Sequence, residues 1–484
     1  MNRIPIARPR RAGWMAAAAL AWFGGSGEAE GQVSAIDGVP PLPPAVPDTA
    51  PPLPLGESLS VPPVQPFSPP PMQPYALPAA ENLYAAEQPT LEAAAEEAAA
   101  EGEPRRYLME LFGAEQSKFQ VYGWIQNSFT ANPAFPSDGI NFGVTPNYAS
   151  NDWRGNQYYT VFERPLDHDG TINFGGRLDF LFGHDHSFNH MRGVFDNAFG
   201  PTQFAGIDLA QFYGEVHLPV LTEGGLDVKF GRWYTLHGYE VVPAIGRPLL
   251  SVPYMFTFGQ PFTHWGLMTT WNVSDNLVIY NGSPQGWDDF QNRNLVWTYM
   301  GGFSYTGLQD KLNLTFVYSY AVNQFHKQEV QLEGGPLIEA SNIGYTGNFT
   351  HLWTTVLSYQ WTDRLTQVLE NDIGYEEDVP FDAGGGVVGH APSRWTSFGN
   401  WFLYELGDNL TGVWRSEIFW DNDGFRTGFA DRYYEQTLGL IYKPCPNLWI
   451  RPETRWDWAQ FGTPYNGGVS GSQFTYGFDI ILLY

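Results

Sequence analysis

Residues 473–484 (QFTYGFDIILLY) alternate between two kinds of side chain. One parity is uniformly large and apolar or aromatic: Phe474, Tyr476, Phe478, Ile480, Leu482 and Tyr484. Successive side chains of a β-strand point to opposite faces, so this period of two predicts a strand with one continuous apolar face. Such a face at the end of a chain needs a cover or an apolar solvent.

The composition is acidic and aromatic, and charged side chains are scarce. The 484 residues have a formal charge of −26, which argues against nucleic acid as a partner. Aromatic residues make up 16% of the chain, and charged residues also 16%, against about a quarter in ordinary soluble domains. A β-barrel whose strands face lipid on one side and water on the other has this composition. A lectin-like β-sandwich is aromatic too, so composition leaves both folds open.

The first part of the chain has three zones. Residues 1–29 contain four arginines near the start, followed by an apolar run of about ten residues. This pattern predicts a secretory signal peptide. Arg10-Arg11 raises the twin-arginine route, but the residues after the pair favour general secretion. Residues 30–80 are proline-rich and predict a periplasmic spacer. Residues 81–117 are rich in Ala and Glu and predict an acidic, partly helical segment.

Two roles are open for this leader: a disordered tether, or a contact with the cell wall or a periplasmic partner. The one cysteine, Cys445, lies far from the N-terminus, so a lipoprotein anchor is not expected. It cannot form an internal disulfide or a CxxC metal site either.

Residues 118–484 consist of about sixteen short alternating segments separated by turn residues. The predicted strands are 119–130, 157–164, 171–182, 206–218, 225–235, 263–273, 276–282, 295–306, 311–323, 350–362, 364–375, 394–405, 409–420, 432–442, 447–458 and 473–484. Short turns alternate with long loops, as in transmembrane barrels with tight periplasmic turns and long external loops. We therefore predict an all-β, antiparallel, up-and-down transmembrane β-barrel of about sixteen strands with both termini at the periplasmic end. Lipid of the outer membrane would then cover the apolar face of residues 473–484.

Several predicted strands separate into an apolar and a charged face. Residues 171–182 put Phe174 and Phe182 on one side and Arg177 and Asp179 on the other. A sandwich would turn the charged face to bulk water and a barrel would turn it to a wet lumen, so strand faces fit both folds. Loop alternation and the signal peptide favour the barrel. The predicted lumen charges are Arg177, Asp179, Lys229, Glu370, Asp372, Arg415, Glu417, Arg451, Glu453, Arg455 and Asp457.

The last strand resembles the C-terminal assembly signal of outer-membrane proteins, which ends on an aromatic residue with hydrophobic residues at alternate positions. The resemblance implies recognition by the barrel-assembly machinery through Tyr476, Phe478, Ile480, Leu482 and Tyr484, with Tyr484 as the main recognition residue.

Three further segments resemble the OmpL-like β-barrel porin family. They are YGWIQNSFTANP (122–133), VKFGRWYTLHGYEVVPA (228–244) and YMFTFGQPFTHWGLMTTWNVSDNLVIYNGSPQGWDD (254–289). The likeness extends over about residues 118–484 and leaves the proline-rich leader unexplained. It implies an outer-membrane channel and supplies no catalytic residue and no known solute.

In general porins of this size the third long loop folds inward and narrows the pore, which by resemblance is residues 237–262 here. This segment offers the charges Glu240 and Arg247 and the aromatic residues Tyr239, Tyr254 and Phe256. Our hypothesis places Glu240 opposite a basic cluster drawn from Lys229, Arg232, Arg415, Arg451 and Arg455. Arg232 shares the parity of apolar neighbours, so it needs a bulge at Gly231 or a strand end. The alternative is a solvated loop above an ordinary lumen wall.

Other functions have weaker support. No GxSxG nucleophile motif occurs, so we expect no enzyme. HDHSFNH (184–190) is either a weak metal cluster or a group of loop histidines, and we expect no metal and no cofactor. The function expected is passive diffusion of small hydrophilic solutes or ions. A plugged barrel, a surface-loop adhesin and a soluble carbohydrate-binding sandwich are the alternatives. Porins of this size are commonly trimers, so a homotrimer is a further expectation.

Overall fold

The computed structural model describes residues 107–113, 117–191, 193–194, 205–290, 297–322, 328–331, 337–340, 349–382 and 388–484. The predicted signal peptide, the spacer and most of the acidic segment lie outside these residues. Within the acidic segment, the short helix α3 (Tyr107–Leu111) precedes the first strand. Its Met109 is buried, and the Met109 sulfur accepts the backbone N–H of Val121 at 3.3 Å. No helix among the described residues is long and apolar enough to cross a membrane.

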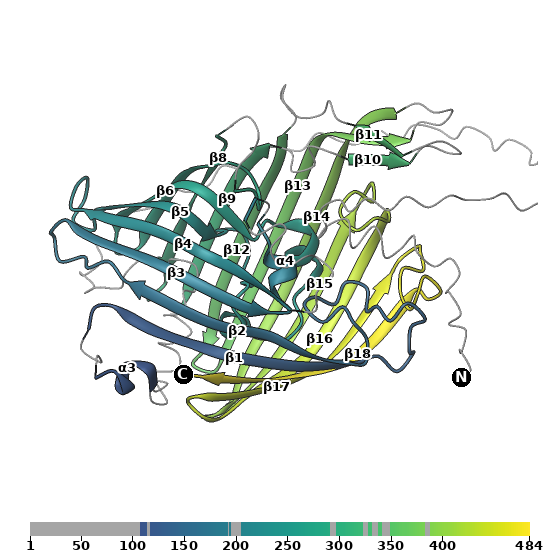
Figure 1. The fold of residues 1–484 in the computed structure, drawn as a ribbon, viewed down its shortest axis with the longest axis horizontal. Coiled ribbons are helices and arrows are strands. Elements are labelled where there is room, and N and C mark those ends of the chain that lie inside the picture. Colours follow the sequence, from purple (N-terminus) through teal and green to yellow (C-terminus); the bar gives the residue numbers. More distant parts are fainter. Residues whose placement is uncertain are drawn as a thin grey trace, which may run out of the picture. The chain divides into compact units, whose positions relative to one another are not determined.

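Sixteen antiparallel strands form one closed barrel, as the sequence predicts (Figure 1). Each strand pairs with its neighbours in chain order, and β1 pairs with β18. The strands are β1 (Gln120–Ala131), β2 (Asp152–Arg164), β3 (Asn173–Gly183), β4 (Gly206–Leu218), β5 (Leu226–Tyr234), β6 (Thr263–Ser274), β7 (Leu277–Pro284), β8 (Tyr299–Gly307), β9 (Leu312–Val322), β12 (Phe349–Thr362), β13 (Leu365–Asp382), β14 (Val388–Gly407), β15 (Leu410–Asp421), β16 (Asp431–Cys445), β17 (Leu448–Ala459) and β18 (Ser472–Leu483).

The connections also alternate as predicted. Short turns join β2 to β3, β4 to β5 and the later pairs at one end, which we call the turn end. Long loops join β1 to β2, β3 to β4 and β5 to β6 at the other end. The small hairpin of β10 (Gln328–Gln331) and β11 (Leu337–Ala340), within the connection from β9 to β12, was not predicted. Strands β13 and β14 run longer than predicted and, in Figure 1, rise toward β10 and β11.

The last residue completes the closure of the barrel. Backbone bonds join Gly123 and Tyr484 in both directions, at 3.1 and 2.9 Å. The Tyr484 hydroxyl lies 2.8 Å from Thr160 Oγ1 and donates to the Tyr159 carbonyl at 3.0 Å. A Cβ at Gly123 would lie 2.6 Å from that hydroxyl, so glycine leaves the space that the tyrosine occupies. The strand edges of β1 and β18 are therefore paired rather than open.

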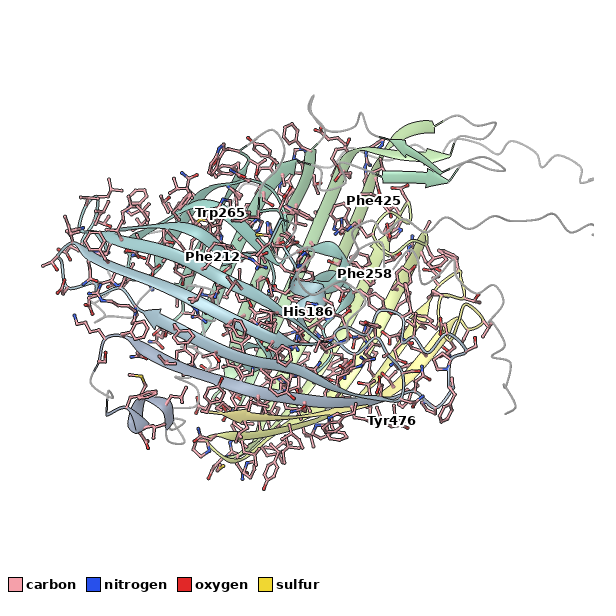
Figure 2. The ribbon with its side chains drawn as sticks, in the orientation of Figure 1. His186, Phe212, Phe258, Trp265, Phe425 and Tyr476 are labelled. Atoms are coloured by element: carbon pink, nitrogen blue, oxygen red, sulfur yellow. The ribbon has the colours of Figure 1, made fainter. Side chains whose placement is uncertain are left out.

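The two faces of the wall differ in the predicted way. On β18, Phe474, Tyr476, Ile480 and Leu482 are exposed and Phe478 is half-buried, while Gln473, Thr475 and Asp479 are buried inside. Figure 2 shows side chains along the whole wall, including Phe212 of β4 and Trp265 of β6, whose ring centroids are 5.3 Å apart. Such an apolar outer surface is stable when its solvent is lipid, and the buried polar groups inside then need partners within the lumen.

Candidate functional site

The connection from β5 to β6, residues 235–262, enters the barrel, and we call it the third loop. Its base is closed by the backbone bond from Thr235 N to the Phe262 carbonyl, at 2.9 Å. Between these points the loop has only single short helical turns, Ala244–Gly246 and Met255–Gly259. Most of its backbone N–H and C=O groups therefore have no ladder partner and must find others.

Carboxylates of the wall accept the N–H groups of the third loop. Glu453 of β17 accepts from Leu250 at 2.9 Å and from Ser251 at 3.2 Å. Glu417 of β15 accepts from Tyr254 and Met255, at 2.6 Å each. Each of the two carboxyl groups accepts N–H groups from two neighbouring loop residues, so Glu453 and Glu417 hold two successive stretches of the loop to one side of the lumen.

Arginines of the same wall donate to loop carbonyls. Arg415 Nη1 donates to the Ser251 carbonyl at 2.6 Å, Arg455 Nη1 to the Val252 carbonyl at 2.7 Å, and Arg451 Nη1 to the Ala244 carbonyl at 3.0 Å. Each guanidinium also pairs with a wall carboxylate. Alternating acids and bases on β15, β16 and β17 thus supply acceptors and donors to an irregular backbone.

The opposite side of the third loop is attached as well. Gln157 of β2 donates to the Val242 carbonyl at 2.8 Å and accepts from Ala244 N at 2.9 Å. The His237 imidazole lies 2.8 Å from both Thr354 Oγ1 of β12 and Ser319 Oγ of β9. The loop therefore bonds to the wall on several sides of the lumen.

Glu370 and Asp372 of β13 form a third attachment point. Glu370 accepts the Tyr239 N–H at 2.9 Å, and the Gln260 amide donates both to Glu370 and, at 2.7 Å, to Asp372. One amide thus bridges two neighbouring buried carboxylates near the end of the loop.

Glu240 meets one of the five cations that the sequence analysis placed opposite it. Its Oε1 accepts from Arg415 Nη1 at 2.8 Å and from the Trp401 indole at 2.9 Å. Arg415 also pairs with Glu435 at 2.9 Å, so its guanidinium joins the loop carboxylate to a wall carboxylate. All three charged groups are essentially inaccessible to solvent.

The other four cations pair elsewhere, so the predicted cluster around Glu240 is wrong for them. Their partners are Glu215 for Lys229 (3.6 Å), Asp208 for Arg232 (2.6 Å), Asp479 for Arg451 (2.5 Å) and Asp457 for Arg455 (2.8 Å). The parity of a strand fixes the face on which a side chain lies but not its height in the barrel. Side chains on the correct face were therefore grouped with the wrong neighbours.

Arg232 reaches the interior at a distorted position, as its parity required. The preceding Gly231 has a backbone φ of 142°, which residues other than glycine rarely adopt. Arg232 lies two residues before the end of β5. Its guanidinium bonds Asp208, the Leu209 carbonyl at 2.6 Å and the Asn189 carbonyl at 2.7 Å. This arginine therefore fastens the β3–β4 connection rather than the third loop.

Arg177 and Asp179 of β3 form a group nearer the turn end. Arg177 pairs with Asp179 at 2.7 Å and with Glu163 at 3.1 Å. Asp179 also accepts from the Tyr159 hydroxyl at 2.5 Å and from Gln211 at 3.0 Å. Both side chains lie on the lumen face, and among the described residues they bond to each other and to β2 and β4 rather than to the third loop.

Every strand of the barrel carries a buried, inward-facing side chain, and we call this set of sixteen residues the belt. Each of the sixteen strands contributes an inward-facing side chain at most 8% exposed: Gln126, Tyr159, Asp179, Gln211, Trp233, Met268, Tyr280, Met300, Val317, Thr354, Glu370, Trp401, Arg415, Glu435, Arg451 and Asp479. A wall that lined a broad aqueous channel would be wetted. In the conformation of the described residues, this belt is shielded from bulk water.

The first long loop contributes to this shielding, which the sequence analysis did not anticipate. Thr145 and Val252 form an antiparallel bridge between the first and third loops. Phe142 packs on Phe258 of the third loop, with ring centroids 6.1 Å apart, and on Tyr465 at 5.8 Å. Phe258, labelled in Figure 2, also packs on Phe419 of β15, with ring centroids 6.3 Å apart. Aromatic contacts thus join three loops over the lumen.

Two charged residues of the third loop retain unpaired atoms. Among the described residues, Glu240 Oε2 and the Nε and Nη1 atoms of Arg247 are buried without a hydrogen-bond partner. Arg247 pairs only loosely with Asp185, at 3.4 Å. Burial lowers the pKa of Arg247 from its ordinary value. Buried polar atoms without partners require water or an ion, so Glu240 and Arg247 mark one place in the lumen where solvent is needed.

The HDHSFNH segment serves the wall in this structure. Asp185 accepts from Asn156 at 2.9 Å and from Gln157 at 2.7 Å, and His186 Nδ1 lies 2.9 Å from the Gly183 carbonyl. Among the described residues, this segment forms no group with metal-ligand geometry. Gln157, His237 and Gln260 were missed as site residues because neutral side chains give no distinctive sequence signal.

Comparison with known proteins decides the family. The family model described as "Putative beta-barrel porin-2, OmpL-like" matches residues 118–484. The chain belongs to this porin family. It is therefore an outer-membrane β-barrel with a channel role, as the resemblance in the sequence implied. No curated protein sequence matches this porin.

Solved structures similar to this porin include three outer-membrane proteins. The outer membrane channel DcaP of Acinetobacter baumannii is 8% identical, with a TM-score of 0.49 over 76% of this chain and 97% of that chain. The anion-selective porin from Comamonas acidovorans is 10% identical, with a TM-score of 0.49 over 76% and 99%. OmpF of Salmonella typhi, in complex with daunomycin, is 11% identical, with a TM-score of 0.48 over 76% and 97%.

Proposed function

We propose that this porin is a narrow outer-membrane channel for passive diffusion of small hydrophilic solutes or ions, and that the third loop controls its opening. The main support is the attachment of this loop to β2, β9, β12, β13, β15 and β17 by side chains. A loop that bonds to the wall on so many sides sets the width of the remaining path.

The path passes Glu240 and Arg247. Both residues carry buried polar atoms without a partner, so a solute or its hydrating water could bond to these atoms without breaking existing hydrogen bonds. Displacing the loop from Arg415 or Glu453 would widen the path, because those residues hold the loop backbone against β15 and β17.

Cations are the preferred ions in this proposal. Among the described residues, fifteen buried carboxylates and seven buried arginines are found, and most of them line the lumen. Fixed charges at a constriction set ion preference more strongly than distant surface charges do. At a pH at which these carboxylates are ionised, their excess over the arginines favours entry of cations over anions.

Orientation and partners belong to the same proposal. The turn end, where β1 begins and β18 ends, faces the periplasm, and the leader can reach the cell wall from there. The barrel-assembly machinery recognises the outward-facing residues Tyr476, Phe478, Ile480 and Leu482 together with Tyr484. The assembled porin is a homotrimer. Its role is transport rather than catalysis, in line with its family.

A second candidate is a plugged barrel whose external loops bind a partner. The shielded belt of sixteen inward-facing residues favours it. The two candidates differ in one property: only the first allows an ionic current to pass through the lumen of the barrel.

Conductance in planar bilayers separates them. The purified protein is inserted, and reversal potentials are measured under a salt gradient. Discrete steps with a cation-selective potential support the loop-controlled channel. An anion-selective potential contradicts the charge argument. Absence of current from protein that migrates as a folded, heat-modifiable barrel contradicts the channel and supports the plug.

A further inference from the structure

Two histidines and one aspartate meet at the turn end of the barrel. His168 lies in the turn between β2 and β3, His217 in β4 and Asp227 in β5. His168 Nε2 is 3.0 Å from Asp227 Oδ2, and His217 Nδ1 is 2.6 Å from Asp227 Oδ1. The two imidazole rings are 4.5 Å apart in an edge-on arrangement. The potential ligand atoms of all three residues lie within 4.8 Å of one another.

This spacing is close to what a divalent transition metal needs. Metal–ligand bonds of about 2.0–2.2 Å from imidazole nitrogen and carboxylate oxygen place the ligand atoms of a tetrahedral site about 3.3 Å apart. The observed separations can reach that geometry through small side-chain rotations. Two imidazoles and one carboxylate are also a common ligand set for zinc and for non-haem iron.

The fold builds the cluster from three separate segments. His217 and Asp227 are direct cross-strand partners on β4 and β5. The β2–β3 turn brings His168 to them over a sequence distance of 59 residues. Gly225, with a φ of 72°, lies against His217, and a Cβ there would be 2.4 Å from His217 Cε1. A larger residue at position 225 would displace the imidazole.

The surroundings suit a bound ion. Asn272 of β6 donates to Asp227 Oδ2 at 3.2 Å and to the Gly224 carbonyl at 3.1 Å, so it orients the carboxylate from behind. The side chains of His168, Asp227 and His217 are 23%, 13% and 1% exposed. An ion can therefore enter from the aqueous turn end, and water can complete its coordination.

We infer that His168, His217 and Asp227 form a binding site for a divalent transition metal of the zinc class, with water as the remaining ligand. The bound ion joins the β2–β3 turn to β4 and β5. The site is separate from the third loop and does not depend on the proposed channel function. The competing explanation is a purely structural hydrogen-bonded array in which Asp227 holds two imidazoles.

Cobalt(II) absorbance tests the site directly. Untagged full-length protein is purified in detergent and treated with a chelator, and Co²⁺ is added at neutral pH. We expect visible d–d bands that saturate at one equivalent per chain, and displacement of Co²⁺ by Zn²⁺ but not by Mg²⁺, which prefers oxygen ligands. Zinc should also raise the temperature at which the folded gel band is lost, because ligand binding stabilises the folded state.

Variants distinguish the two explanations. His168→Gln keeps a hydrogen-bonding side chain in the turn but removes an imidazole ligand, and we expect metal affinity to fall about 10-fold or more. His351→Gln is the matched control, because His351 contacts one carboxylate, Glu377 at 3.2 Å, and the Tyr318 hydroxyl at 2.9 Å, and belongs to no possible metal-ligand group among the described residues. Its affinity should equal that of the wild type.

Three results would overturn the inference. They are absence of saturable Co²⁺ bands in a folded wild-type barrel, equal affinities of wild type and His168→Gln, and equal losses in His168→Gln and His351→Gln. His217→Gln, with its buried imidazole, gives a second test if it folds, and it should weaken Co²⁺ binding as His168→Gln does.

Discussion

Arg415 and Glu240 form the ion pair that joins the barrel wall to the third loop, with 2.8 Å between Nη1 and Oε1. Because Arg415 also pairs with Glu435, replacing Glu240 leaves the guanidinium with one carboxylate. Glu240→Gln keeps the size of the side chain and an acceptor for the Trp401 indole but removes its charge. We expect a reversal potential shifted toward anions and a loop held less firmly, by about 1–3 kcal/mol.

Bilayer recordings of Glu240→Gln and of Asp408→Asn measure this shift. Asp408 lies in the short β14–β15 turn and is exposed, so Asp408→Asn removes the same charge far from the loop. An unchanged reversal potential in Glu240→Gln, or equal shifts in the two variants, would show that Glu240 does not contribute to a constriction.

His237 makes the attachment of the third loop sensitive to acid. The pKa of the His237 imidazole is well below 6.5, mainly because the ring is buried and to a lesser extent because His264 is nearby. A base whose pKa is lowered by folding stabilises the folded state at high pH, and this contribution is lost as pH falls below the unfolded value of about 6.5. Protonation would break the acceptor side of the contacts to Thr354 and Ser319. We therefore expect channel openings to become more frequent below about pH 6.

Single-channel recordings between about pH 7 and pH 5 test this expectation. His237→Gln can still donate and accept but cannot take up a proton in this range, so its openings should depend less on pH. His351→Gln, on the outer face, serves as the control. If His237→Gln and the wild type respond to acid equally, another group controls the response.

Much of the barrel could be predicted because its two solvents differ so strongly. The outer face of each strand meets lipid and the inner face carries polar and charged side chains, so apolar and polar residues alternate along the strand. Residues 171–182 show this alternation, with Phe174 and Phe182 on one face and Arg177 and Asp179 on the other. All sixteen barrel strands were located from this alternation and from turn residues. The extra hairpin β10–β11 lies within a loop and has no such constraint, which is why it was missed.

The interior of the site was less predictable. Which wall residues meet the third loop depends on strand tilt and on the irregular path of the loop, and neither leaves a periodic signal. Gln157, for example, bonds Val242 and Ala244 across more than 80 positions of the chain. Likewise, His168, His217 and Asp227 come from three segments and share no spacing motif. The sequence pattern gave the correct face for Lys229 but not its partner, Glu215.

Gly439 of β16 leaves room for Leu249 of the third loop. A Cβ at position 439 would lie 2.4 Å from Leu249 Cδ2. We expect Gly439→Ala to displace the loop and to lower the free energy of unfolding by about 1–3 kcal/mol. Leu249→Ala alone should also be destabilising, because Leu249 is buried. In the double variant, the smaller residue at 249 should offset part of the overlap.

Urea unfolding, followed by the loss of the folded gel band, provides the four values of this double-mutant cycle. Gly214→Ala of β4 is a matched control, because nothing lies within 4 Å of a Cβ placed there. Strict additivity of the two substitutions would mean that Gly439 and Leu249 do not constrain each other.

Tyr484 combines two roles that substitutions can separate. Its hydroxyl bonds Thr160 and the Tyr159 carbonyl, and its aromatic ring ends the outward-facing row of β18. Tyr484→Phe keeps the ring and loses both hydrogen bonds, so it should reach the outer membrane in normal amounts and be less stable by about 1–2 kcal/mol. Tyr484→Ala also removes the ring, so its amount in the outer membrane should fall several-fold if the assembly machinery reads this residue.

Phe474→Ala separates recognition of the terminal residue from general loss of apolar surface. Phe474 lies on the same outward face of β18 and is 40% exposed, but it stands ten residues before the end. Quantitative immunoblots of membrane fractions compare the variants. A larger deficit for Tyr484→Ala than for Phe474→Ala supports recognition of the terminal aromatic ring. Equal deficits would mean that assembly depends on the apolar face of the strand as a whole and that Tyr484 acts mainly in closing the barrel.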